Sequence, residues 1–349
     1  MNRYHSTATS SLLLFLILLS ITPMTSALTK TVPPPLSLQE RINQAPPGST
    51  IELTTENNTE PLIITKPLHL KGNKTYPTQL HITSPSNGYG LWINAENVTL
   101  SNLTVCNTAS GLYTTAIKIS APHTTIENCT IHDTPIGIAI WNSQNTITHC
   151  QFATCDDEGI VLLGTPTHPC TNTIITDCAF QLNCDGIELQ YTAHTTISHC
   201  SFTNNTHAGI DAIGQNNTYL TITGSTFNHN EGFGVYLHRT THTTINDCLF
   251  HHDTITTYDA TENILQNNTD ASLQQLISQT IPPVDLYGAV EYSHQQTSQQ
   301  PLLHQTLRST QEDTEKTTTQ PYSFRVLHHI LSRIQTVLTY VKQLHHNPM

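Results

Sequence analysis

Acidic residues recur at matched places beside a short apolar phrase of the form Gly-Ile-x-Ile. Glu188 and Asp211 stand between the two apolar residues of the phrase, and Asp157, Glu158 and Asp185 lie at or just before its start. Paired carboxylates can hydrolyse a glycosidic bond, one as acid and the other as nucleophile or base. Clustered carboxylates also repel each other, so the group raises one pKa or holds a cation such as calcium. A hydrated polar face without chemistry fits the same pattern.

Other copies of the phrase carry aromatic and basic residues. Lys118 and Tyr236 occupy the position between the two apolar residues, and Trp141 and His238 directly follow the phrase. Aromatic side chains offer a large apolar surface on which a sugar ring can stack. We therefore expect these four residues to bind substrate next to Asp157, Asp185, Glu188 and Asp211 as the catalytic candidates.

The elements that must position these residues are two alternating phrases. The first reads T-I-S-H-C-S-F at 196–202, with five variants, which occupy 125–131, 146–152, 174–180, 221–227 and 244–250. The second begins at Ile136, Glu158, Asp185, Ala208 and Phe233. Both phrases are rich in Ile, Thr, Val and Phe, which favour strands. Because the interval between copies varies from 21 to 28 residues, the repeat predicts a solenoid of short strands joined by loops.

A break in alternation within the first phrase predicts a sharp turn. Ile197, Cys200 and Phe202 are expected to point inward, yet Ile197 and Cys200 are three residues apart. The residue before the cysteine must then bend the chain. Asn, Asp, His and Gly tolerate a left-handed backbone, and they alone fill this position, as Asn128, His149, Asp177, His199, Gly224 and Asp247.

These phrases resemble the right-handed parallel β-helix of the pectin-lyase-like superfamily. Residues 37–51 and 61–72 also resemble the opening of NosD-like proteins. The resemblance covers about 37–255 and implies an all-β, single-stranded parallel β-helix of about nine or ten coils. It also implies a short N-terminal capping helix whose apolar stripe is Leu38, Ile42 and Ala45.

Resemblance to particular enzymes leaves the reaction open. Cys-Asp-Asp-Glu-Gly-Ile at 155–160 is faintly similar to polygalacturonase strands, but that family's Gly-His-Gly and Arg-x-Lys motifs are missing. The strand at 146–152 resembles a pectate lyase strand, with His149 at the matching position and Thr148 in place of an acid. Polysaccharide lyase, epimerase and glycoside hydrolase all remain open, and so does the absence of catalysis.

The nine cysteines fall into two sets. Cys129, Cys150, Cys178, Cys200 and Cys248 share one position of the first phrase, where an inward cysteine behaves as a small apolar residue. Equivalent atoms of adjacent coils lie about 4.8 Å apart, which is wide for a disulfide. Outside this column, Cys155 and Cys184 follow neighbouring copies of the phrase, and we predict a disulfide between them.

The composition indicates an exported protein. The net charge of −12 and only 13 Lys and Arg exclude a basic nucleic-acid surface. Residues 1–27 combine an apolar run with small residues before a cleavage position, as a signal peptide does. Asn-x-Thr sequons permit glycosylation in a suitable host. We expect a monomeric glycoprotein that is secreted, periplasmic or at the cell surface.

The C-terminal part differs from the repeat. Residues 256–322 are polar and read as a tail and linker with an end-cap segment. Residues 323–349 contain an amphipathic helix pattern, and 323–344 carry Arg325, Arg333 and Lys342. Such a helix can cover the open end of the solenoid or lie on a membrane surface.

Three functions are therefore compared. The first is a β-helix that binds or modifies a cell-surface or extracellular polysaccharide. The second is a non-catalytic surface or adhesion solenoid. The third, implied by the NosD-like resemblance and by 21 histidines, is an accessory protein that handles copper.

Overall fold

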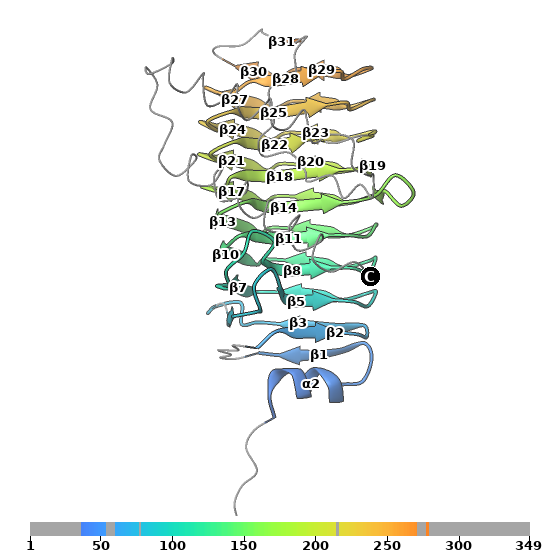
Figure 1. Ribbon diagram of the computed structural model, residues 1–349, viewed down its shortest axis with the longest axis vertical. Coiled ribbons are helices and arrows are strands. Elements are labelled where there is room, and N and C mark those ends of the chain that lie inside the picture. The colour runs from blue at the N-terminus through green and yellow to red at the C-terminus, as the bar shows by residue number, and fades with distance from the viewer. Residues whose placement is uncertain (1–35, 54–59, 77, 214–215, 271–276, 279–349) are drawn as a thin grey trace, which may run out of the picture. The chain divides into compact units, whose positions relative to one another are not determined.

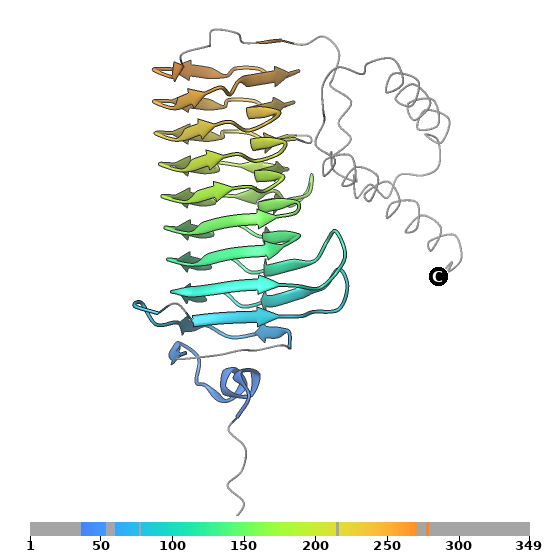
Figure 2. The same cartoon turned by 90° about the vertical axis from the view of Figure 1, so that its left-hand side faces the viewer.

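The computed structural model describes residues 36–53, 60–76, 78–213, 216–270 and 277–278. The predicted signal peptide and C-terminal amphipathic helix lie outside these residues. From Leu38 onward the described chain winds through three parallel sheets, stacked coil upon coil (Figures 1 and 2). About nine coils carry a strand in every sheet, because the shortest large sheet has nine strands, which agrees with the predicted number. None of the helices in the described ranges is long and apolar enough to cross a membrane.

After the first coil, which has no described strand in sheet C, each coil runs through sheet A, then sheet C, then sheet B. Sheet A contains β1 (Ser49–Glu52), β3 (Leu68–Lys71), β6 (Thr99–Ser101), β9 (Thr125–Glu127), β12 (Thr146–Thr148), β16 (Ile174–Thr176), β20 (Thr196–Ser198), β23 (Thr221–Thr223), β26 (Thr244–Asn246) and β29 (Ile264–Gln266). Sheet C contains β4 (Thr78–Ile82), β7 (Leu103–Asn107), β10 (Thr130–Thr134), β13 (Gln151–Cys155), β17 (Ala179–Gln181), β21 (Ser201–Thr203), β24 (Thr226–Asn228), β27 (Leu249–His251) and β30 (Thr269–Asp270).

Sheet B holds the Gly-Ile-x-Ile phrases. It contains β2 (Leu62–Ile64), β5 (Tyr89–Ile93), β8 (Thr115–Ile119), β11 (Ile136–Ile140), β14 (Glu158–Leu163), β18 (Asp185–Gln190), β22 (Ala208–Ala212), β25 (Phe233–His238), β28 (Ile255–Tyr258) and β31 (Ile277–Ser278). Two short strands, β15 (Cys170–Thr171) and β19 (Thr192–Ala193), pair between the longer loops. Before β1, helix α2 (Leu38–Gln44) buries Leu38 and Ile42, and Ala45 packs against the core.

The predicted bend is present in every copy of the first phrase. Its residues, from Asn128 to Asp247, have φ between 52° and 58°. This left-handed turn carries the chain from sheet A into sheet C, and it explains why the position excludes β-branched residues. Further positions of positive φ were not predicted, and they include bulky residues such as Leu182 (59°) and Tyr219 (54°).

The solenoid continues past residue 255, where the sequence pattern was expected to end. The segment from Ile264 to Asp270 forms β29 and β30, with Leu265 paired to Ile245. Asn267 makes the bend, with φ of 52°. Asn268 takes the place of the column cysteine, and its side-chain oxygen accepts a hydrogen bond from the Cys248 amide at 3.0 Å. The missing Cys and Phe hide this copy in the sequence.

The core consists of ladders of identical side chains. Five phenylalanines stack with ring centroids 4.7–4.9 Å apart and interplanar angles of 5–6°, namely Phe152, Phe180, Phe202, Phe227 and Phe250. The glycine of the second phrase faces this stack. A Cβ atom at Gly186 would lie 2.6 Å from Cδ1 of Phe202 and 2.5 Å from the Gly209 carbonyl oxygen. The two phrases are thus complementary, because the phenylalanine of one requires the glycine of the other.

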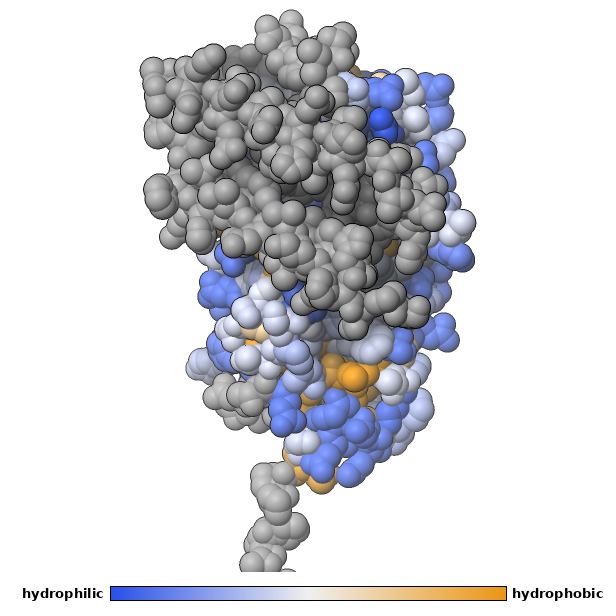
Figure 3. All heavy atoms as spheres, viewed as in Figure 1, coloured by the Kyte–Doolittle hydropathy of each residue, from blue (hydrophilic) through white to orange (hydrophobic). Residues whose placement is uncertain are grey.

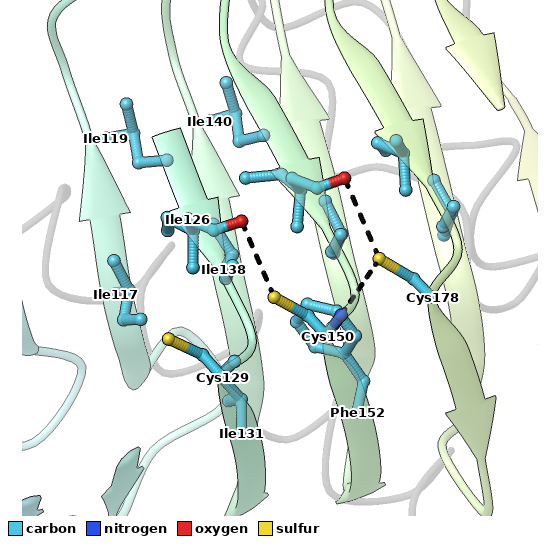
Figure 4. Packing of buried hydrophobic residues seen from close by; sticks show 14 of the residues in the cluster. Ile117, Ile119, Ile126, Cys129, Ile131, Ile138, Ile140, Cys150, Phe152 and Cys178 are labelled. Atoms are coloured by element: carbon cyan, nitrogen blue, oxygen red, sulfur yellow. Dashed lines mark hydrogen bonds between the residues drawn. The ribbon is translucent and has the colours of Figure 1, made fainter. Parts of the chain in front are cut away.

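The cysteine column is buried beside the phenylalanine stack (Figure 4). The Cys150 thiol donates to the Ile126 carbonyl oxygen at 3.6 Å, and the Cys150 amide donates to the Cys178 sulfur at 3.4 Å. The predicted disulfide between Cys155 and Cys184 is absent, since both are free thiols. Asn183, one residue before Cys184, occupies the position next to Cys155 on the following coil. Its side-chain oxygen accepts a hydrogen bond from the backbone amide of Cys155 at 3.0 Å.

All nine thiols should resist alkylation in the native protein. Burial raises the pKa of Cys155 above its ordinary value and that of Cys170 to about 12, so little reactive thiolate forms. Treatment with iodoacetamide at pH 8, followed by intact-mass analysis, should show no adducts without denaturant and nine with it, even without a reductant. Seven adducts under denaturing conditions would mean that two cysteines form a disulfide, as the sequence predicted.

Candidate functional site

The outward positions of sheet B form one continuous column. Backbone pairing places each residue beside its equivalent on the next coil, in the order Ile63, Trp92, Lys118, Ala139, Val161, Glu188, Asp211, Tyr236 and Thr256. This is the register that aligning the Gly-Ile-x-Ile phrases predicts. Figure 1 shows these strands stacked along the middle of the view. The order of residues in this column therefore determines which candidate side chains lie next to each other.

Five carboxylates and one imidazole gather where β14, β18 and β22 pair. We call Asp157, Glu158, Asp185, His207, Glu188 and Asp211 the acid–histidine cluster. Glu158 pairs in register with Asp185, and Glu188 with Asp211. His207 precedes β22, and its Nδ1 lies 2.8 Å from Oδ1 of Asp185 and 3.8 Å from Oδ2 of Asp211. The four predicted catalytic residues thus lie on three neighbouring coils.

The carboxylates of the acid–histidine cluster are buried. Asp185 and Asp211 are each 1% exposed, and Glu188 is 3% exposed. The Glu188 carboxylate accepts a hydrogen bond from the side-chain amide of Gln190. Burial raises the pKa of Glu158 well above its ordinary value, and the neighbouring Glu188 and Asp185 raise it further. Glu158 therefore retains its proton at a higher pH than an ordinary glutamate does, as a general acid requires.

A second group lies on the N-terminal half of the same face. We call Tyr89, Trp92, Lys118 and Trp141 the aromatic–lysine patch. The Lys118 ammonium lies 4.0 Å from the ring centroid of Tyr89, 5.3 Å from that of Trp92 and 5.4 Å from that of Trp141. The Trp92 indole donates to the Ser120 hydroxyl at 2.9 Å. Trp141 remains 39% exposed.

An apolar strip separates the two groups. Ile136, Ala139 and Val161 form a small cluster outside the main core, with Leu163 packed against it. Figure 3 shows apolar residues among hydrophilic ones nearer the N-terminal end of this face, and the strip itself is not visible in that view. The face therefore passes from aromatic and cationic to apolar, and then to acidic, along the coil axis.

The two remaining predicted binding residues lie beyond the acid–histidine cluster. Tyr236 is buried one coil after Asp211 and stacks on Phe233 at 4.9 Å. His238 lies 5.1 Å from the Tyr258 ring, and burial together with Arg239 lowers its pKa. Neither residue is near Trp141, so Lys118 and Trp141 are brought together without Tyr236 and His238.

The sequence reading missed Tyr89 and Trp92 as members of the patch and did not give His207 a role. Tyr-Gly-Leu-Trp-Ile at 89–93 is itself a copy of the second phrase, with Trp92 between its apolar residues. It was missed because the preceding coil lacks the Thr-Ile-x-x-Cys phrase that marks the others. Extending the alignment upstream by one coil would have found it.

A right-handed helix of three stacked parallel sheets defines the class of this protein. The chain matches the family model described as right handed beta helix region over residues 69–221 and 168–272, and it belongs to that family. A search of curated proteins finds no match for it.

Solved structures share the fold at low identity. The protein ORF18 of Geobacillus virus E2 is 12% identical with a TM-score of 0.50, covering 66% of this chain and 57% of its own. Tailspike protein 2 of Escherichia coli O157:H7 bacteriophage CAB120 is 13% identical with a TM-score of 0.49, covering 66% of this chain and 35% of its own. An alginate lyase from Paenibacillus is 14% identical with a TM-score of 0.41, covering 66% and 94%. Several such structures are named as polysaccharide-acting enzymes, and the likeness to this chain is one of fold.

Proposed function

We propose that this protein binds an anionic polysaccharide along the outward face of sheet B. The observation that supports the proposal best is the aromatic–lysine patch, where one ammonium group lies among three aromatic rings. Among the described residues, Lys118 forms no ion pair, so its charge is available to an acidic sugar. Trp141 presents part of its ring to solvent, as stacking on a sugar requires.

The dimensions of the face suit an extended glycan. The strand of Lys118 lies three coils from that of Glu188 in the paired register. At about 4.8 Å per coil, this separation is about 14 Å. A glycan lying along the column would meet the patch first, then the apolar strip and then the acid–histidine cluster.

Modification of the glycan is the second part of the proposal. In the acid–histidine cluster Glu158 is the candidate acid, because burial and nearby carboxylates raise its pKa. Asp157, Asp185, Glu188 and Asp211 are the candidate partners for hydrolysis, and elimination and epimerisation use the same kinds of group. The burial of the cluster favours binding at the patch as the primary function.

Export and a monomeric state belong to the same proposal. A polysaccharide partner outside the cell agrees with the signal-peptide pattern of residues 1–27 and with the sequons. Contact with a membrane surface through residues 323–344 is a separate proposal from the sequence. The non-catalytic adhesion solenoid is the variant in which the patch binds and the cluster does no chemistry.

Replacing Trp141 with Ala, or Lys118 with Gln, should weaken binding to uronate-rich polysaccharides. The loss should be at least about tenfold, equivalent to about 1.4 kcal/mol, because each change removes one of the groups that contact the sugar. Glycan arrays followed by titration calorimetry would measure it. Tyr76→Ala is the matched control, because Tyr76 is an exposed aromatic residue outside sheet B. Unchanged binding in both variants, or a preference for neutral glycans, would refute the proposal.

A further inference from the structure

Three potential metal ligands converge within the acid–histidine cluster. One ligand atom from each of Asp185, His207 and Asp211 lies within 4.8 Å of the other two, and within the described ranges no other group of three does so. This is notable in a chain with 21 histidines. The other close histidine–carboxylate pairs, His132–Asp133, His149–Asp177 and His242–Glu262, each bring only one carboxylate to the imidazole and lie at the surface.

The spacing of the three atoms fits a bound ion. Zinc binds imidazole nitrogen and carboxylate oxygen at about 2.0–2.2 Å, so two ligands of a tetrahedral site lie about 3.4 Å apart. Nδ1 of His207 is 2.8 Å from Asp185 and 3.8 Å from Asp211, and these distances bracket that value.

The chemistry of the donors selects the kind of ion. Calcium prefers oxygen ligands and six to eight of them. A neutral imidazole with two carboxylates suits divalent transition metals such as zinc, manganese or cobalt instead. Copper(I) prefers soft sulfur ligands, and none of the three converging residues, Asp185, His207 and Asp211, carries sulfur.

The surroundings hold the ligands in place. The Phe233 ring meets the His207 ring edge-on, with centroids 5.8 Å apart and an interplanar angle of 86°. Ala208, beside Asp185 in the paired register, leaves room where a longer side chain would crowd the site. The Asp185 and Asp211 side chains are 2% exposed and that of His207 is 14% exposed, so an ion would be shielded from most of the solvent.

We propose that Asp185, His207 and Asp211 bind one divalent transition-metal ion, which links the coil of β18 to the coil of β22. Nδ1 of His207 coordinates as the neutral imidazole, with its proton on Nε2. Glu188, beside Asp211 in the register, offers an additional oxygen ligand. The ion adds a further link between coils that backbone pairing, core packing and the hydrogen bonds from Asn183 to Asn205 already join. This proposal does not depend on glycan binding.

The test uses the full-length protein after dialysis against a chelator. Titration with Co²⁺ should give visible d–d absorption that saturates at one equivalent, and Zn²⁺ should displace it. Elemental analysis after dialysis against Zn²⁺ should find one ion per chain. The protein's melting temperature should rise with Zn²⁺, because the ion binds the folded state alone. A hundredfold excess of Ca²⁺ should not displace the cobalt.

The variants His207→Gln and Asp211→Asn should each abolish the cobalt spectrum and the stoichiometric zinc. The matched controls His149→Gln and Asp177→Asn alter an exposed pair of the same types and should bind as the unaltered protein does. Circular dichroism of each variant establishes that it folds. Retention of one zinc ion in both cluster variants, displacement by calcium, or no binding to the unaltered protein would overturn the assignment. Glycan binding measured on the same samples tests the proposed function separately.

Discussion

The Phe202→Ala variant should unfold at a much lower denaturant concentration than the unaltered protein. Truncating a buried phenylalanine typically lowers the free energy of unfolding by about 3–5 kcal/mol, through lost burial and the cavity that remains. Phe202 is fully buried and stacks on two rings, Phe180 at 4.9 Å and Phe227 at 4.9 Å. Each aromatic pair adds about 0.5–1.5 kcal/mol beyond burial, so the loss belongs at the upper end of the range.

Denaturant titration followed by circular dichroism measures this change. Phe202→Leu keeps an apolar side chain in the stack and should cost clearly less. Tyr76→Ala, at an exposed aromatic residue, should leave the midpoint unchanged. A shift below about 1 kcal/mol for Phe202→Ala would mean that neighbouring coils repack around the gap, contrary to the close packing of protein interiors.

Replacing Asn205 with Ala should have the second large effect on stability. Its side-chain oxygen accepts bonds from the amide and the side chain of Asn183, each at 3.1 Å. Its side-chain nitrogen donates to Asn230 at 2.8 Å and to the Phe180 carbonyl oxygen at 3.4 Å. Leaving a buried polar group without its hydrogen-bond partner lowers the free energy of unfolding by about 1–3 kcal/mol. The Asn205→Ala substitution leaves several buried groups without a partner. We expect a decrease of about 3–5 kcal/mol in the free energy of unfolding.

Asn228→Ala provides the matched control for this ladder. Asn228 lies one coil further on, and within the described part of the chain its side-chain oxygen is hydrogen-bonded to the neighbouring His229 ring alone. The control should change the free energy of unfolding by less than about 0.5 kcal/mol. Equal effects of the two substitutions in thermal and denaturant unfolding would argue against a special role for the buried ladder.

The sequence predicted the parts of the fold that depend on residue type at a repeated position. The bend at Asn128 and its equivalents was predictable because the left-handed backbone restricts which residues fit. The similar bend at Leu182 was not, because nothing in a leucine indicates positive φ. There the neighbouring coils impose the conformation, and single-residue preferences carry no signal of it.

The candidate site was predictable in its register but not in its environment. Alignment of the phrases placed Glu188 beside Asp211, as the pairing shows. The role of His207 and the burial of the carboxylates depend on side-chain packing between coils, which no spacing along the chain reveals. The disulfide prediction was wrong for the same kind of reason, since Asn183 and not Cys184 stands next to Cys155.

The column on sheet B also places its side chains at a fixed spacing, which is one strand separation per coil. Each coil touches chiefly its two neighbours, so a whole coil can be gained or lost without redesigning the rest. Such a change would alter the separation between Lys118 and Glu188 by one strand spacing of about 4.8 Å, and by no smaller amount. Relatives that differ by one coil between β8 and β18 would therefore match polymers whose repeating units differ in length, with both ends of the binding face left intact.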